Sequence, residues 1–166
     1  MQNFNNKTIL ITDKIHNSLI DILSKYGFSF TTDLGITHEK LINVIHNFEG
    51  VVLRSRLVFD KEIIDAATNL RFIARAGSGM ENIDVKTAES KGIICINSPE
   101  GNRDSVGEHA LGLLLSIFHN INVSDAETKV GIWDRKKNRS KELKGKTVGI
   151  IGYGNTGSAL AKRLNC

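Results

Sequence analysis

A glycine-rich turn near the end of the chain constrains its fold more than any other feature. The apolar run 146–151 leads into the pattern Gly-x-Gly-x-x-Gly, formed by Gly152, Gly154 and Gly157, and helix-forming residues follow as far as Leu164. In a strand–turn–helix unit these glycines permit a tight turn, close approach of a pyrophosphate and close helix–strand packing, in that order. The context predicts the start of a dinucleotide-binding unit, and an ordinary glycine turn is the alternative.

The composition indicates a globular protein. The chain has 166 residues, of which 40% are hydrophobic and 24% charged, which suffices for one domain and part of a second. No signal-peptide-like run opens it, and the apolar run 110–118 is too short for a membrane span. We therefore expect a cytoplasmic protein with no membrane partner. Cys95 and Cys166 lie in unrelated contexts and no metal-ligand spacing occurs, so we expect reduced thiols and no metal site.

The first 96 residues alternate between strand-like and helix-like segments. The strand-like segments are residues 8–11, 28–30, 50–53, 70–74 and 93–96. Capping residues Thr37, Asp60 and Asp84 are expected to start helices between them, and Gly27 and Gly92 to end helices. This alternation predicts a parallel α/β sheet with helices on both faces and right-handed crossovers.

A change of pattern follows the fifth strand-like segment. Residues 97–102 contain the only proline, and we expect the domain boundary there, between domains 1–98 and 99–166. Residues 103–119 then have helical spacing with apolar side chains on much of the circumference, which predicts burial against more than one neighbour. A core helix and a helix at a domain or subunit interface are both compatible with this pattern.

Basic residues are concentrated before the glycine turn. Seven of them fall between Arg135 and Lys146, opposed only by Glu142. Because no aromatic residues are interleaved with them, we predict a solvated connector, not a nucleic-acid site. The local positive field could instead attract a small anionic substrate.

Several motifs occur in a characteristic order. They are Leu-Arg-Ser-Arg at 53–56, Arg-Ala-Gly-Ser-Gly-Met-Glu-Asn-Ile-Asp at 75–84, Asn-Ser-Pro-Glu-Gly-Asn at 97–102, Ser-Val-Gly-Glu-His-Ala at 105–110, Gly-Ile-Trp-Asp-Arg at 131–135 and Glu-Leu-Lys-Gly-Lys-Thr at 142–147. From about Gly50 onward the chain resembles the D-isomer-specific 2-hydroxyacid dehydrogenases, most of all those that oxidise 3-phosphoglycerate. The resemblance implies a flavodoxin-like parallel-sheet substrate domain at 1–98. It implies an interdomain helix and the first β-α unit of a Rossmann NAD-binding domain at 99–166.

The resemblance also assigns roles to individual residues. The implied substrate-binding residues are Arg54, Ser55, Gly77 and Gly79. The implied cofactor-binding residues are Ser78, Val106, Gly152, Gly154, Asn155, Thr156 and Gly157. Arg54, Arg56 and Arg135 fit a doubly charged anion such as a phosphorylated hydroxy acid. Many relatives have an arginine where this chain has Asn155, which weakens the argument for tight cofactor binding.

The histidines of this chain are not predicted to be catalytic. Glu108 and His109 are neighbours on one helix and cannot face each other, so we expect no dyad. No partner is evident in the sequence for the four other histidines, for which we predict no role. They are His16, His38, His46 and His119.

The reaction implied by the resemblance is NAD-dependent oxidation of a D-2-hydroxy acid, foremost 3-phosphoglycerate, to the 2-oxo acid. NADP is not excluded, because the acidic residue that would discriminate is expected beyond Cys166. The catalytic Arg, Glu and His are also expected beyond Cys166, so we expect the chain alone to be inactive. A small anionic acid is the expected ligand, and a dimer the expected full-length assembly. The alternative is a non-catalytic dimerisation or regulatory module that pairs with a full-length relative.

Overall fold

The chain forms two units. The computed structural model describes residues 8–165, and its internal contacts divide the chain into unit 1, Met1–Pro99, and unit 2, Glu100–Cys166. The division falls in the segment that contains the only proline. The substrate and cofactor roles expected for the two domains stay predictions.

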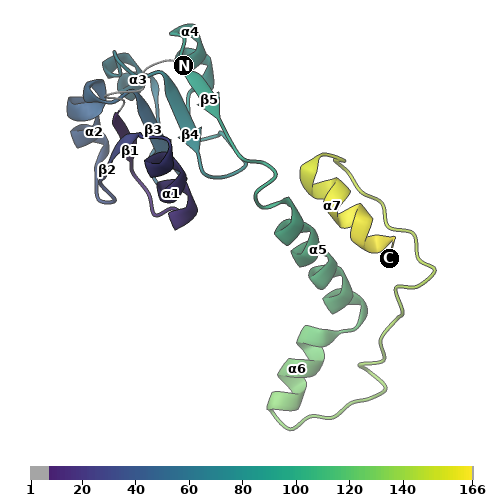
Figure 1. Cartoon of the computed structure of the whole chain (residues 1–166). Helices are drawn as coiled ribbons and strands as arrows, with labels where there is room; N and C mark the ends of the chain where they lie inside the picture. The colour runs from purple at the N-terminus through teal and green to yellow at the C-terminus, as the bar shows by residue number, and fades with distance from the viewer. Residues whose placement is uncertain (1–7, 166) are drawn as a thin grey trace. The chain divides into compact units, whose positions relative to one another are not determined.

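Unit 1 is built on a parallel five-stranded sheet (Figure 1). Its strands are β1 (Thr8–Ile11), β2 (Ser29–Thr32), β3 (Gly50–Leu53), β4 (Phe72–Arg75) and β5 (Ile94–Ile96). They lie in the order β2-β1-β3-β4-β5 and every neighbouring pair is parallel. This is the strand order of flavodoxin-like sheets, with the reversal of order between β1 and β3. The predicted α/β fold class is therefore confirmed.

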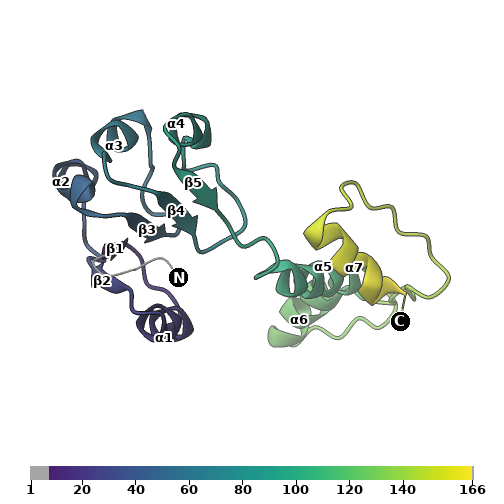
Figure 2. The ribbon, with the colours of Figure 1, turned by 45° about the horizontal axis from the view of Figure 1, so that its top comes forward.

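Helices cover both faces of this sheet (Figure 2). They are α1 (Asn17–Lys25), α2 (His38–Val44), α3 (Lys61–Ala66) and α4 (Val85–Ser90), with a 3-10 turn η1 (Ile45–Asn47) after α2. Side chains alternate along a strand, so Leu10 packs with the core beneath α2, α3 and α4, whereas Ile9 and Ile11 pack on the α1 side. On the same side as α1, Ile94 and Ile96 of β5 are exposed. The larger core therefore lies on the three-helix face.

The predicted helix boundaries depend on local signals that the structure confirms. The side chains of Thr37, Asp60 and Asp84 each accept a hydrogen bond from the backbone N–H three residues later. Gly27 and Gly92 follow α1 and α4 with φ of +73° and +76°, a region that glycine enters without strain.

Two histidines have partners that the sequence prediction missed. His16 caps α1, because its Nδ1 accepts a hydrogen bond from the N–H of Ser18 at 3.2 Å. His38 Nε2 lies 2.8 Å from Asp60 Oδ2, which joins the first residue of α2 to the cap of α3. Both contacts are structural, and the partner of His38 was missed because it is 22 residues away in the sequence. The absence of a catalytic role for these histidines stays a prediction.

The Asp60 contact predicts an acid dependence of stability. The pKa of Asp60 is lowered from 3.8, first by the backbone N–H of Ile63 and also by His38. A carboxylate with a lowered folded-state pKa stabilises the fold above its ordinary pKa, and this contribution is lost as the pH falls through the folded value. We expect Asp60→Asn to reduce the unfolding free energy at pH 6, with the difference from wild type shrinking below pH 3.8. Urea unfolding across this range measures it, and a constant difference down to pH 3 would contradict the prediction.

The described part of unit 2 contains three helices and no strand. They are α5 (Arg103–Phe118), α6 (Ile121–Lys129) and α7 (Asn155–Leu164). α6 was not predicted, because its apolar residues Ile121 and Val123 form no buried stripe and are exposed. Asn120, with φ of +53°, separates it from α5. No helix within residues 8–165 combines the length and apolar character that crossing a bilayer requires.

The position of α5 was predicted correctly but its burial was not. Gly107 is its only buried residue, while Leu113 and Ile117 are 52% and 73% exposed. Side chains on most of its circumference therefore lack neighbours within unit 2. The core-helix and interface alternatives for α5 therefore both stay predictions.

The strand expected at residues 146–151 is not formed. This segment has no ladder partner among the described residues of unit 2, and Ile151 is fully exposed. A β-strand exists only when a neighbouring strand accepts and donates its backbone hydrogen bonds. The apolar pattern indicates a buried strand correctly only where such a neighbour is present.

Candidate functional site

The carboxyl edge of the unit 1 sheet gathers the predicted substrate-binding residues. Open α/β sheets bind ligands outside the carboxyl ends of their strands, where the strand order reverses. In unit 1 this reversal lies between β1, which leads to Asp13, and β3, which leads to Arg54. The register pairs Leu53 with Arg75 of β4, so the loop after β4 leaves the sheet beside the Arg54 loop.

Arg54 has a fixed backbone and a free side chain. Its N–H donates to Asp13 Oδ2 at 2.9 Å, and its C=O accepts from Asn82 Nδ2 at 2.9 Å. The residue is exposed, and its guanidinium has no partner within residues 8–165. Ser55 is likewise exposed on this loop. Arg54 can therefore offer a planar fork of donors to a carboxylate or phosphate.

Arg56 does not share this property, which corrects the prediction that it fits an anionic ligand. Its guanidinium donates to the backbone C=O of Ile36 and of Thr12, both at 2.8 Å. Its Nε also lies 3.5 Å from Asp13 Oδ1. With its donors directed at protein oxygens, Arg56 ties the loop to the exit of β1. The third predicted arginine, Arg135, belongs to unit 2.

The loop at Gly77, Ser78 and Gly79 is held from the exit of β5. Asn97 Nδ2 donates to the C=O of Ser78 at 2.7 Å, and the N–H of Ser98 donates to the C=O of Gly77 at 2.9 Å. The N–H of Gly77 donates to the C=O of Arg75 at 2.8 Å, so this amide is engaged within the loop, and the substrate-binding role of Gly77 stays a prediction. The N–H groups of Ser78 and Gly79 have no acceptor within residues 8–165. These two amides are the donors that the loop leaves unengaged, and the carboxylate of Glu81 lies beside Gly79, where a Cβ would come within 1.9 Å of its Oε2.

Asn82 joins the two loops, a contact that the sequence prediction missed. Its Nδ2 bonds the C=O of Arg54 and, at 2.8 Å, that of Leu57, while its Oδ1 accepts from Arg75 Nε at 3.0 Å. The only signal in the sequence was the position of Asn82 within the motif after β4, which does not reveal its partners. The structure thus connects Arg54 with the Gly77 loop through one amide side chain.

The glycine turn of unit 2 has backbone features in common with a dinucleotide-binding turn. Gly152 has φ of +90°, and a Cβ built on Gly157 would lie 2.0 Å from the C=O oxygen of Gly152. No side chain can occupy that space. A Cβ on Gly154 would meet nothing within 4 Å, so the backbone there is open to approach. The glycines therefore fit the cofactor group predicted for them.

The start of α7 presents backbone donors beside this turn. Gly154 occupies the N-cap without a side-chain hydrogen bond, and the N–H of Ser158 donates to its C=O at 3.0 Å. The N–H groups of Asn155 and Thr156 precede that bond, so they have no acceptor within the helix. Both residues are exposed. A phosphate group is a suitable acceptor for such groups.

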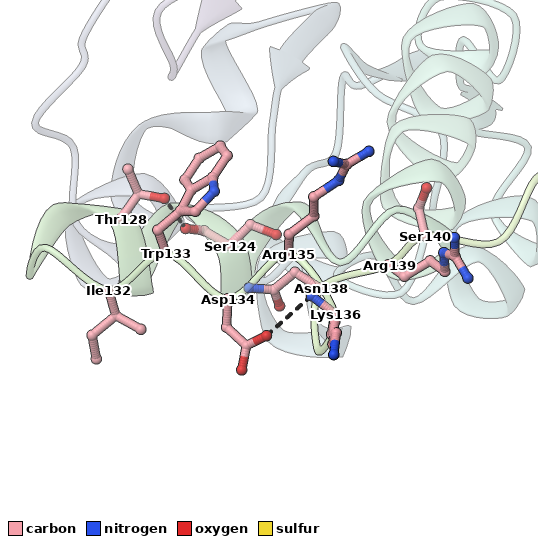
Figure 3. Close-up of a pocket in the computed structure, with 10 residues that line it drawn as sticks. All are labelled: Ser124, Thr128, Ile132, Trp133, Asp134, Arg135, Lys136, Asn138, Arg139 and Ser140. Atoms are coloured by element: carbon pink, nitrogen blue, oxygen red, sulfur yellow. Dashed lines mark hydrogen bonds between the residues drawn. The ribbon is translucent and has the colours of Figure 1, made fainter.

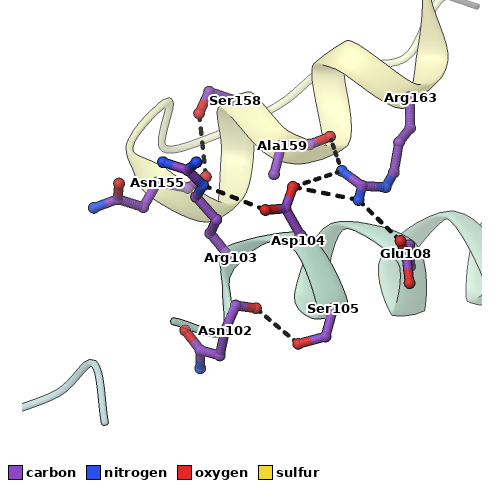
Figure 4. Close-up of polar contacts among 9 residues, drawn as sticks. All are labelled: Asn102, Arg103, Asp104, Ser105, Glu108, Asn155, Ser158, Ala159 and Arg163. Carbon is purple, nitrogen blue, oxygen red and sulfur yellow. Dashed lines mark hydrogen bonds and ion pairs between the residues drawn. The ribbon is translucent and has the colours of Figure 1, made fainter. Parts of the chain in front are cut away.

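α7 is held in place by α5 (Figure 4). A Cβ on Gly107 would come within 3.0 Å of the Ala159 backbone, so glycine permits close helix contact here. Arg163 lies 3.0 Å from Glu108 and 3.4 Å from Asp104, and Glu108 raises its pKa. Glu108 therefore has a partner on α7, as expected for a structural residue and not for a dyad with His109. Val106, predicted near the nicotinamide, lies on the same helix and is 39% exposed.

The loop after α6 places three basic residues, Arg135, Lys136 and Arg139, around an open hollow (Figure 3). Trp133 is 82% exposed there, and Arg135 also lines the hollow. The loop is fixed to α6 because Glu127 bonds Lys137 and, at 2.6 Å, Asn138 Nδ2. Lys137 is the main cause of the lowered pKa of Glu127. The first part of the basic connector is therefore tied to α6 through Glu127.

The chain matches known proteins over most of its length. Residues 9–163 match the D-isomer specific 2-hydroxyacid dehydrogenase catalytic domain. The chain is 41% identical over 155 residues to D-3-phosphoglycerate dehydrogenase of Archaeoglobus fulgidus, covering 93% of this chain and 29% of that protein. It is 42% identical over 153 residues to hydroxypyruvate reductase of Thermotoga maritima, covering 92% of this chain and 50% of the relative. The chain thus spans between about a third and a half of these relatives.

Solved structures give the same result. NAD+-bound 3-phosphoglycerate dehydrogenase of Entamoeba histolytica is similar with a TM-score of 0.73 and 28% identity, over 96% of this chain and 51% of that one. An NADPH-dependent glyoxylate/hydroxypyruvate reductase of Sinorhizobium meliloti, in complex with citrate, is similar with a TM-score of 0.74 and 25% identity, over 97% and 51%. With the matched family domain and the flavodoxin-like strand order, these similarities show that the chain belongs to the D-isomer-specific 2-hydroxyacid dehydrogenase family.

Proposed function

We propose that this chain supplies acid-binding and dinucleotide-binding elements of an NAD(P)-dependent dehydrogenase that acts on 2-hydroxy or 2-oxo acids. The observation that carries this proposal is Arg54, an arginine with a fixed backbone and an unpaired guanidinium at the switch point of the sheet. The unengaged amides of Ser78 and Gly79 on the adjacent loop support it. Together they offer the donors that a carboxylate needs.

We propose 3-phosphoglycerate as the foremost substrate. Relatives named D-3-phosphoglycerate dehydrogenase and hydroxypyruvate reductase are 41% and 42% identical to this chain. Because similarity alone does not separate these two names, the proposal of a substrate also uses the charge of the ligand. 3-Phosphoglycerate carries a carboxylate and a phosphate, and a guanidinium binds either group in a bidentate manner. Because Arg56 is engaged with the protein, unit 1 offers one free arginine on this loop.

The cofactor proposed is NAD, with NADP kept open. Gly152, Gly154 and Gly157 would shape the turn, and the N–H groups of Asn155 and Thr156 would bind the pyrophosphate. A bound nicotinamide supplies the hydride chemistry. One similar structure is NAD+-bound and another enzyme is NADPH-dependent, which supports the dinucleotide without selecting between the two.

Titration with 3-phosphoglycerate tests the acid-binding role of Arg54. We expect saturable NMR shifts of the backbone amides at 54–57 and 77–79, and weakening by about 10- to 100-fold in Arg54→Gln, because a charge-assisted hydrogen-bond pair is lost. The matched control is Arg71→Gln, which removes an exposed arginine, 3.7 Å from Glu49, before β4 begins. Equal loss in both variants, or no loss in Arg54→Gln, would contradict the assignment.

We propose further that the 166-residue chain binds these ligands without turnover. Proton transfer from the substrate hydroxyl requires a positioned base, and residues 54–59 and 76–82 contain no histidine. Absorbance at 340 nm should therefore stay constant with NAD and 3-phosphoglycerate. Sustained NADH formation would show that this chain contains the complete catalytic set.

The exposed apolar surface of unit 2 favours a second candidate function, association with a second copy or with a longer relative. The exposed apolar residues of α5, α6 and the loop after α6 include Leu113, Ile117, Ile121, Val123, Val130, Ile132 and Trp133. Exposed apolar surface of this extent is typical of interaction sites. Light scattering after size-exclusion chromatography tests whether two copies of this chain associate. We expect the mass of a dimer for the wild-type chain and the mass of a monomer for Ile117→Glu. Mixing with a full-length relative tests the regulatory alternative.

A further inference from the structure

The backbone of Arg54 is held at both of its polar groups by side chains from two other loops. Asp13, after β1, accepts its N–H, and Asn82, after β4, donates to its C=O, both at 2.9 Å. Three strand exits therefore meet at one residue. We propose that Asp13 and Asn82 are positioning residues that orient Arg54 for binding a carboxylate or phosphate, an inference that rests on the proposed function.

The amide of Asn82 is specifically required by its three contacts. A neutral amide has two N–H donors and one carbonyl acceptor, and here the donors serve the C=O of Arg54 and of Leu57 while the acceptor serves Arg75 Nε. A carboxylate at this position would keep the bond to Arg75 and lose both donors. Asn82→Asp therefore releases the Arg54 loop while retaining the size and the Arg75 contact of the side chain.

Asp13 has a different task, which explains why Arg54 stays free. Its carboxylate is nearly buried, at 9% exposure, and a buried charge needs a partner. Arg56 supplies that partner, 3.5 Å away, and donates as well to the C=O of Thr12 and Ile36. The Asp13 carboxylate thus accepts the N–H of Arg54, while Arg56 balances the negative charge of this carboxylate. The guanidinium of Arg54 is left uncompensated for a ligand.

Arg75 extends the same arrangement to the Gly77 loop. Its side chain is only 11% exposed, and a Cβ on Gly77 would lie 2.8 Å from its Nη1. Asn82 therefore contacts an arginine that lies against Gly77 and also pairs with Glu81 at 3.3 Å, in the loop where the Ser78 and Gly79 amides have no acceptor within residues 8–165. A preorganised site loses affinity when its donors move by a fraction of an ångström. Loss of the Asn82 donors should reduce ligand affinity through Arg54.

Asn82→Asp in the 166-residue chain tests the proposal, with NMR titration of 3-phosphoglycerate as the readout. We expect affinity to fall by about 10-fold, the size of one hydrogen-bonded positioning contact. Asn69→Asp is the matched control, because Asn69 Nδ2 donates to the C=O of His46 at 2.7 Å, in the segment that leads into β4. Its affinity should equal that of wild type. Asn82→Ser, which keeps a single donor, provides a second variant if Asn82→Asp does not fold.

A double-mutant cycle separates positioning from general stabilisation. If Asn82 acts through Arg54, Asn82→Asp should cause no further loss of affinity in an Arg54→Gln background. Additive losses, or unchanged affinity of Asn82→Asp and Asn82→Ser while Arg54→Gln binds weakly, would overturn the positioning role and leave the proposed function standing. Absence of 3-phosphoglycerate binding by the wild-type chain would overturn both.

Discussion

Replacement of Gly157 by alanine is expected to disrupt the glycine turn of unit 2. The added Cβ would lie 2.0 Å from the C=O oxygen of Gly152 and 3.4 Å from Ile150 Cγ2. The close contact is a backbone atom, so no side-chain rotation can relieve it. The turn must open or α7 must shift, at a cost of about 1–3 kcal/mol or more. Unit 2 has few buried side chains, so a cost of this size should displace the start of α7.

Two other glycines in the same segment provide controls. A Cβ on Gly149 or on Gly154 would meet nothing within 4 Å, so alanine at either position should leave the amide spectrum of 150–164 nearly unchanged. Gly154→Ala should nevertheless weaken NAD binding, because the pyrophosphate is proposed to approach there. Large shifts of the α7 amides in Gly149→Ala, or none in Gly157→Ala, would show that the turn does not have the described geometry.

Phe59→Ala is expected to cause the largest loss of stability in unit 1. The side chain is fully buried in the three-helix-face core, and removal of a buried phenylalanine costs about 3–5 kcal/mol. Domains are stable by only about 5–15 kcal/mol. Its backbone also pairs with the loop after β4, since its N–H bonds the C=O of Asn82 and its C=O accepts from the N–H of Asp84, both at 2.8 Å. The substitution should therefore loosen the loops that hold Arg54.

Urea unfolding of unit 1 measures this loss, with Tyr26→Ala as control. Tyr26 is 65% exposed, so its truncation should change the unfolding free energy by less than about 0.5 kcal/mol. A similar midpoint for both variants would mean that Phe59 is not part of the cooperative core.

Local signals were sufficient for most of unit 1. The carboxylates of Asp60 and Asp84 cap the helices that directly follow them, and Gly27 and Gly92 adopt a positive φ at helix ends. Both effects depend on a few adjacent residues and not on the rest of the fold. Apolar runs bounded by these signals predicted five strands, and their alternation with helices predicted a parallel sheet. The same reasoning failed at 146–151, because an apolar run becomes a strand only when another strand pairs with it.

Arg54 and Arg56 show which property of the site could not be predicted from the sequence, namely which guanidinium is free. They are the same residue type two positions apart, and both fit an anion by chemistry. Arg56 is directed at the oxygens of Thr12, Asp13 and Ile36, whereas Arg54 is fixed through its backbone by Asp13 and Asn82. Every one of these partners is distant in the sequence, so no local pattern distinguishes the two arginines.

The amino-acid sequence by itself determined the helix caps, the glycine turns and the alternating apolar runs, because each depends on the intrinsic conformational preferences of a few adjacent residues. Only the tertiary structure decided which arginine is free, which glycine amides are open and which asparagine orients them. Those properties depend on hydrogen bonds between the exits of β1, β3, β4 and β5, segments that only the folding of the sheet brings together.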